Sequence, residues 1–171
     1  YRYILPDIFS DSGIPYFVDA KTEILFHPFV EAVDSVFDIF ENGFKREDVF
    51  RFLRTGMTDL TTDEIDYLEN YILSTGIRGK KKYFHPFAIR SNSYSQDEDM
   101  LRVNAIREKF INSFIQLDKS LKKDATVRQI ATGLYRFITS FNCEEKINKR
   151  KLFHENNGNA IAAKEYSQIY A

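Results

Sequence analysis

The chain has 171 residues, of which 43% are hydrophobic and 15% aromatic, so it is long and apolar enough to bury a core of its own. Its net charge of −1 excludes the strongly basic composition typical of freestanding nucleic-acid binders, so any contact with nucleic acid requires a local basic patch. The single cysteine, Cys143, excludes an intramolecular disulfide and any multi-cysteine zinc or iron–sulfur site in these residues.

The sequence carries no sign of a membrane or a secretory route. No apolar run approaches the roughly 18 residues that a membrane-spanning helix needs, and the start, Y-R-Y-I-L-P-D, lacks the organisation of a signal peptide. We therefore expect a cytoplasmic location and no membrane contact. The absence of an initiating methionine indicates a piece of a longer protein.

The first residues predict a short helix followed by a strand. Residues 3–12 have a helical pattern that stops at Gly13, and residues 14–18 form a brief apolar run after a Gly-Ile-Pro turn. A lone strand needs partners to be stable, and no other segment supplies them. The start of the chain therefore indicates the edge of a larger, sheet-containing protein.

Amphipathic helices are predicted from there on. Apolar residues recur at helical spacing over residues 28–42, with Pro28 suited to the first turn and Gly43 to the end. A second helix is expected over residues 46–55.

Thr61 and Glu64 form a capping-box signature that opens a third helix, which ends at Gly76. Residues 77–98 then combine a lysine run with a polar stretch, and they predict a long exposed loop.

The remainder of the chain is predicted to be helical. Helices are expected over residues 101–121, from the cap residue Thr126 to about residue 141, and over residues 144–155 and 160–170. The last of them carries an apolar stripe, which packs either on the preceding helix or on chain outside these residues: Ala163, Tyr166 and Tyr170. The fold class is mainly α.

Residue patterns for catalysis are missing. ATP hydrolysis by a P-loop enzyme needs a G-x-x-x-x-G-K-[ST] loop, and a metal-dependent nuclease needs carboxylates and a lysine at the ends of adjacent strands; the sequence provides neither. His27, His85 and His154 allow a metal cluster, but two of them stand in His-Pro-Phe, which favours a turn or helix start anchored by the phenylalanine. Cys143 has no evident His or Asp partner, which favours a buried thiol over a nucleophile.

One segment has the composition of a contact with DNA. A basic cluster follows a helix end, and its glycines allow backbone amides to approach a phosphate: Gly76, Arg78, Gly79, Lys80, Lys81 and Lys82. The alternative is an ordinary solvated loop. A second basic stretch is expected only to decorate an exposed helix face: Lys146, Lys149, Arg150 and Lys151.

Several short motifs, in this order, resemble the B subunit of the ATP-dependent helicase/deoxyribonuclease, the AddB/RexB family. They are G-I-P-Y-F-V-D at residues 13–19, F-R-F-L-R-T-G at 50–56, L-E-N-Y-I-L-S-T-G-I-R-G at 68–79 and A-A-K-E-Y-S-Q-I-Y at 162–170. The resemblance implies the helical 2B-like insertion of a superfamily 1 helicase fold. Residues 1–19 would be the end of a RecA-like domain, with a short helix and strand, and residues 20–171 the 2B-like domain.

The resemblance implies that the parent protein processes double-strand DNA breaks for recombinational repair, together with an AddA/RexA partner subunit. ATP, Mg²⁺ and an iron–sulfur cluster would bind outside these residues, which would hold no catalytic residue and no cofactor. The glycine loop at residues 76–79 matches a loop that rests on duplex DNA in related helicases, except that K-K-K-Y-F-H-P-F follows it in place of an immediate helix.

Two other interpretations remain open. A helical protein–protein interaction module with no role on DNA would bind a partner helix in phenylalanine-rich grooves. Its binding would be largely insensitive to salt, whereas duplex affinity through a lysine loop would fall with rising salt. A complete small enzyme is disfavoured, because no constellation of acid, base and nucleophile is present.

Overall fold

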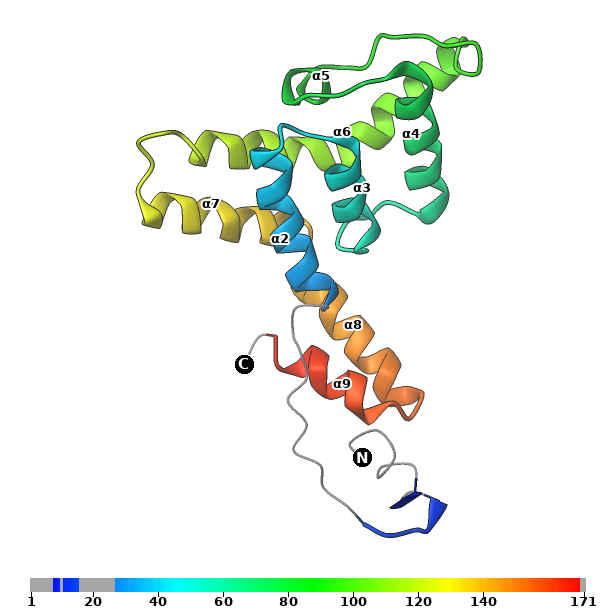
Figure 1. Ribbon diagram of the computed structural model, residues 1–171, viewed down its shortest axis with the longest axis vertical. Coiled ribbons are helices and arrows are strands. Elements are labelled where there is room, and N and C mark those ends of the chain that lie inside the picture. The colour runs from blue at the N-terminus through cyan, green and yellow to red at the C-terminus, as the bar shows by residue number, and fades with distance from the viewer. Residues whose placement is uncertain (1–7, 10, 16–26, 170–171) are drawn as a thin grey trace.

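The computed structural model describes residues 8–9, 11–15 and 27–169, and this part of the chain is α-helical (Figure 1). Its only pairing of strand type is an isolated bridge between Ser91 and Tyr94, which confirms the mainly α fold class. The helices are α2 (Pro28–Glu41), α3 (Arg46–Arg54), α4 (Thr62–Thr75), α5 (Lys80–Phe84), α6 (Asp97–Ser120), α7 (Val127–Ser140), α8 (Cys143–Asn156) and α9 (Ala160–Ser167).

Local signals set several helix starts as predicted. The Thr61 hydroxyl accepts from the Glu64 amide at 3.2 Å, and the Glu64 carboxylate accepts from the Thr61 amide at 3.0 Å, which completes a capping box. Thr126 opens α7 with the same reciprocal arrangement. At α2, Pro28 occupies the first turn, and His27 caps it by accepting from the Phe29 amide at 3.2 Å.

Two sequence-based boundaries were wrong. The polar residues before 101 belong to α6, which begins at Asp97, because a Gln96–Asp99 capping box and an acidic first turn favour the helix start there. The segment predicted as a long loop contains α5, and two of its aromatic side chains, Phe87 and Tyr94, are buried. Their burial holds this segment against α4 and α6, so it is not a free loop.

The core is built from aromatic rings that meet edge to face around Phe114 of α6. Its ring centroid lies 5.2 Å from that of Phe52 in α3, 4.9 Å from that of Phe137 in α7 and 5.8 Å from that of Phe44. Such pairs add about 0.5–1.5 kcal/mol each beyond the burial of their area. This cluster joins helices that are distant in the sequence.

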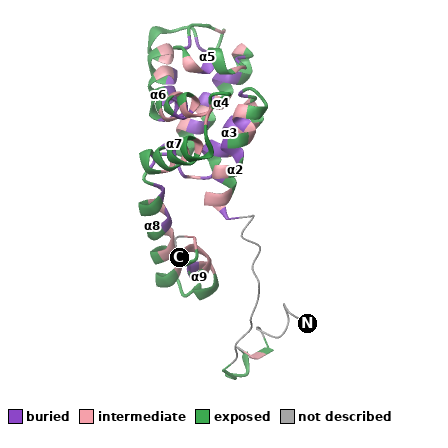
Figure 2. Ribbon diagram, turned by 90° about the vertical axis from the view of Figure 1, so that its left-hand side faces the viewer, coloured by how far each residue is buried: buried purple, intermediate pink, exposed green. Residues whose placement is uncertain are grey.

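Helices α2 to α7 form one body, from which α8 and α9 project as a hairpin (Figure 1). Buried residues concentrate in the body, whereas the hairpin is mostly exposed (Figure 2). In α9, Ala163 is buried, and the Tyr166 ring stacks on His154 of α8 with centroids 5.4 Å apart. The apolar stripe of α9 therefore packs on the preceding helix, while Tyr170 lies outside the described residues.

The predictions for the start of the chain fall mostly outside the described residues. Ile8, Phe9 and Asp11 are helical, and Gly13 has the left-handed φ of 65° that suits a helix end. The strand predicted over residues 14–18 is described only at its first two residues. The strand and the boundary between residues 19 and 20 therefore stay predictions.

Candidate nucleic-acid interface

The glycine loop lies between the end of α4 and the start of α5. Gly76 ends α4 in the left-handed conformation, with φ 63°, and its amide donates to the Ile72 carbonyl at 2.9 Å. Gly79 has φ 94° and immediately precedes α5, where its carbonyl accepts from the Lys82 amide at 3.0 Å. The expectation that no helix follows this loop directly was wrong. A single turn of helix is too short to show a recognisable period in the sequence.

Contacts from the body hold this loop in place. The Gly79 amide donates to the Phe44 carbonyl at 3.4 Å, and Tyr83 is buried with its ring 5.8 Å from that of Phe44. The Arg107 guanidinium donates to the Tyr83 carbonyl at 3.0 Å. The backbone of α5 is therefore fixed on both of its sides.

Arg107 is a residue that sequence reasoning missed. It lies on α6 with only 4% of its surface exposed, and burial lowers its pKa. The signal was present in the sequence, because Arg107 stands at helical spacing within the apolar stripe of Val103, Phe110 and Phe114. A charged residue at such a position needs a buried acceptor, and the Tyr83 carbonyl provides one.

The predicted basic residues differ in their surroundings. The Lys80 ammonium pairs with the Asp118 carboxylate, at 2.9 and 3.1 Å from its two oxygens, and lies 5.8 Å from the centre of the Phe84 ring. Arg78, Lys81 and Lys82 are exposed, and none of them forms an ion pair with another described residue. Three cationic groups beside the glycine loop are thus available to an external anion, and Lys80 is partly neutralised.

The second basic stretch does more than decorate a helix face, so that expectation was wrong for two of its members. Lys146 pairs with Asp59 at 2.7 Å, and the Arg150 guanidinium donates to the Thr55 carbonyl at 3.0 Å. Lys149 and Lys151 pair with carboxylates on their own helix. Lys146 and Arg150 attach α8 to the body, a role that depends on partners some 90 residues earlier in the chain.

The histidines have structural surroundings. His27 and His154 both contact the Tyr166 ring, with centroids 4.5 and 5.4 Å away, whereas His85 lies at the end of α5. Within residues 8–9, 11–15 and 27–169, no group of three or more His, Cys, Asp or Glu side chains is arranged to hold a metal ion. The prediction that His-Pro-Phe starts a helix is confirmed at α2, and at the second copy Phe87 is the buried anchor.

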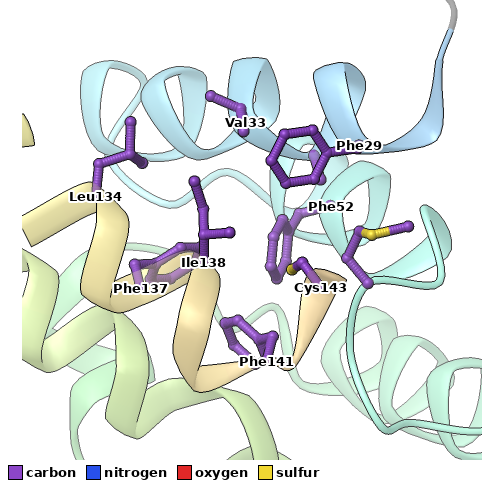
Figure 3. A pocket seen from close by; sticks show the side chains of 10 residues that line it. Phe29, Val33, Phe52, Leu134, Phe137, Ile138, Phe141 and Cys143 are labelled. Carbon is purple, nitrogen blue, oxygen red and sulfur yellow. The ribbon is translucent and has the colours of Figure 1, made fainter. Parts of the chain in front are cut away.

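Cys143 is a buried thiol, as predicted. It lines an apolar cavity of about 10 Å³ together with Phe29, Phe52 and Phe141, and Figure 3 shows these side chains closing around it. Burial raises the pKa of the thiol, which disfavours the reactive thiolate. A space of this volume is at the lower limit for one water molecule, so it cannot accept a substrate.

No described helix combines the length and the apolar character needed to cross a bilayer.

Known proteins resemble the chain along most of its length, although no family model matches it. Three relatives bear the name ATP-dependent helicase/deoxyribonuclease and are the B subunits of Clostridium novyi, Lachnoclostridium phytofermentans and Acetivibrio thermocellus. The chain is 37% identical to the first over 170 residues, 40% to the second over 164 residues and 33% to the third over 178 residues. The chain is homologous to one segment of the AddB/RexB-type helicase/deoxyribonuclease.

The matches cover 99%, 93% and 99% of this chain but only 15%, 14% and 16% of the three relatives. The sequence-based resemblance to the AddB/RexB family is therefore confirmed along nearly the whole chain. At the same time, the chain corresponds to about one seventh of a full-length AddB/RexB protein.

Proposed function

We propose that this chain is a non-catalytic, 2B-like helical domain of an AddB/RexB-type protein, and that it contacts duplex DNA through the surface around α5. Its homology to this family supports the connection with DNA, because these relatives are named helicase/deoxyribonuclease. The observation that carries the contact itself is the rigid glycine loop beside α5 with its exposed cations. The surface comprises Gly76, Arg78, Gly79, Lys80, Lys81 and Lys82.

The physical case depends on local charge. The chain as a whole has a net charge of −1, so a general attraction to DNA is excluded. Arg78, Lys81 and Lys82 nevertheless carry three positive charges within five residues and have no ion-pair partner in the described part of the chain. Cations held by a fixed backbone can replace the counterions around DNA phosphates at little cost in ordering.

In this proposal the chemistry belongs to other parts of the parent protein. The AddB/RexB-type parent would work in the cytoplasm with an AddA/RexA-type partner on broken duplex ends, for recombinational repair. ATP, Mg²⁺ and an iron–sulfur cluster would bind outside this chain, whose described residues contain no metal-binding cluster. The domain would hold the duplex while other domains unwind and cut it.

The test is duplex binding measured by fluorescence anisotropy at low and moderate salt. The intact chain is compared with Lys81→Ala/Lys82→Ala and with a control, Lys149→Ala/Lys151→Ala, which removes two lysines from α8. Loss of two phosphate contacts should lower the slope of log K against log salt by about 1.8 in the α5 variant only. If the intact chain shows no salt-sensitive binding, or if both variants bind equally, the proposal fails.

A second candidate function is contact with the AddA/RexA-type partner through a groove between α2, α7 and α8. The groove has a volume of about 590 Å³, and its lining includes Phe29, Ile138, Tyr135 and Leu152. Tyr135 and Leu152 are exposed, which favours a covered interface over a solvent face. Tyr135→Glu should then abolish salt-insensitive binding of the partner, and Leu101→Glu, at an exposed position of α6, should leave it unchanged.

A further inference from the structure

We propose that two lysines distant from α5 in the sequence, Lys45 and Lys122, extend its basic surface into one composite phosphate-binding surface. The inference rests on the proposed contact between α5 and DNA, and it adds residues that no local motif connects with that contact. Two contacts within the fold place them there: the hydrogen bond between Gly79 and Phe44, and the ion pair between Lys80 and Asp118.

Lys45 is placed by its neighbour Phe44, whose carbonyl accepts from the Gly79 amide. Consecutive Cα atoms are about 3.8 Å apart, so Lys45 follows directly after the residue that contacts the glycine loop. Lys45 is exposed and has no ion pair among the described residues. Its ammonium group is therefore available on the same edge of the body as the start of α5.

The backbone at Phe44 fixes this placement. Phe44 has φ 60°, a left-handed conformation that is rare for a bulky side chain. Its ring is buried and lies 5.3 Å from that of Phe84 and 5.8 Å from that of Tyr83, both in α5. The core therefore holds an unfavourable backbone conformation that turns the chain toward the glycine loop, and Lys45 follows from that turn.

Lys122 is placed by the other partner of α5. Asp118, near the end of α6, accepts from Lys80, and the Cα of Lys122 can lie no more than about 14 Å beyond that of Asp118. The Lys122 carbonyl accepts from the Ala125 amide at 2.9 Å, which defines the turn after α6. Lys122 is exposed without an ion pair in the part of the chain that the structure describes, and one acidic residue, Asp124, shares its turn.

Asp118 acts within this surface as a counter-charge. Its carboxylate holds the Lys80 ammonium, whose side chain is still 49% exposed. A phosphate that approaches Lys80 must compete with this carboxylate and is repelled by it. Removing the charge of Asp118, while keeping its shape as asparagine, should therefore strengthen binding of a polyanion.

The form of the surface selects the class of ligand. Its cations come from three separate segments, at residue 45, at α5 and after α6, and no residue of α5 lines the groove or the small cavity described above. A spread surface without a pocket fits a row of phosphates and does not enclose a nucleotide or a single phosphate. The ligand inferred here is the backbone of a nucleic-acid duplex.

The test extends the anisotropy titration of duplex DNA to two further variants of the 171-residue chain, Lys45→Ala/Lys122→Ala and Asp118→Asn. The double variant should lower the salt slope by about 1.8, as the α5 variant does, and Asp118→Asn should raise affinity at low salt. The Lys149→Ala/Lys151→Ala control should match the intact chain. Thermal unfolding of each variant establishes that the surface substitutions leave the fold intact. Tripolyphosphate, a short free polyanion, is added as a competitor and should displace duplex only weakly.

The outcomes separate the two proposals. If Lys45→Ala/Lys122→Ala binds like the intact chain while the α5 variant loses affinity, the composite surface is wrong and the α5 contact stands. An unchanged affinity in Asp118→Asn contradicts the counter-charge. If the intact chain itself shows no salt-sensitive binding, the proposed function fails and the composite surface fails with it. Efficient displacement by tripolyphosphate would reassign the ligand to a free polyanion.

Discussion

The body formed by α2 to α7 and the hairpin formed by α8 and α9 are held together by different forces. In the body, aromatic rings from several helices meet around Phe114 and are excluded from water. The hairpin buries little beyond Cys143, Ile147 and Ala163 among its described residues. It is attached largely by polar contacts and by a ring contact between His27 and Tyr166.

This difference teaches where each region is sensitive. Apolar packing is spread over many contacts, so the body should unfold as a unit and respond to changes in volume. Directional polar contacts are few, so the hairpin should open locally at a lower free energy than global unfolding. Substitutions that affect one kind of force and not the other can test the contrast.

The largest effect is expected from Phe114→Ala. Removing a ring at the centre of the aromatic cluster leaves a cavity and should lower the free energy of unfolding by about 3–5 kcal/mol. Denaturant-induced unfolding measures the change. The matched control is Phe153→Ala in α8, where the ring is 63% exposed, and a shift within about 0.5 kcal/mol is expected. Equal losses in the two variants would refute the assignment of stability to the body.

An intermediate effect is expected from Gly56→Ala, which targets the attachment of the hairpin. Gly56 has φ 72°, and a Cβ there would lie 2.1 Å from a terminal nitrogen of Arg150. The side chain of Arg150 must move, which breaks its hydrogen bond to the Thr55 carbonyl, a charged bond of about 1.5–3 kcal/mol. Hydrogen exchange should speed up in α8 and α9 and change less in α2 to α7.

Gly43→Ala is the matched control, because Gly43 has the same φ of 72° and open space around its Cβ position. It carries the same backbone cost of about 1–2 kcal/mol without displacing Arg150. The difference between the two variants therefore measures the contact of Arg150 alone. Identical exchange in α8 and α9 for both variants would show that Arg150 does not hold the hairpin.

The smallest effect concerns the pH dependence of the same junction. Burial, with a contribution from the positive charge of Arg150, lowers the pKa of His27 below its ordinary value of 6.5. The unfolded chain then binds more protons at His27 than the folded chain does, so stability should fall as pH drops below about 6.5. His27→Asn keeps a capping acceptor for α2 and removes the titrating group.

Thermal unfolding of the intact chain and of His27→Asn, measured from about pH 7.5 down to about pH 5, checks this expectation. The variant should lose part of the decline in stability that the intact chain shows on acidification. Parallel curves for the two proteins would mean that His27 does not titrate in this range, or titrates equally in the folded and unfolded chains.

The parts of the fold that could be predicted from the sequence are those with local causes. The capping boxes at Thr61 and Thr126 depend on residues three positions apart, and the amphipathic spacing of α2 and α4 depends on one face of one helix. α5 escaped prediction because its five residues hold a single buried side chain, Tyr83. Its conformation depends on contacts from α6 and from Phe44, which only the fold brings near.

The candidate site shows the same division. The run of basic residues beside the glycine loop could be found from composition alone. The pairing of Lys80 with Asp118 joins residues 38 positions apart, and the bond from Arg150 to Thr55 spans 95 positions. A sequence pattern contains no information on such pairs, so Lys80 could not be separated from its neighbours, nor Arg150 from an ordinary surface arginine.

The ring contact between His27 and Tyr166 brings the place where the chain enters the helical assembly beside the place where it leaves. The two centroids are 4.5 Å apart, although 139 positions separate the residues. A unit with adjoining entry and exit can be carried in a loop of a host domain without forcing the two sides of that loop apart. Growth or loss of such a unit during evolution would leave the framework of the host undisturbed.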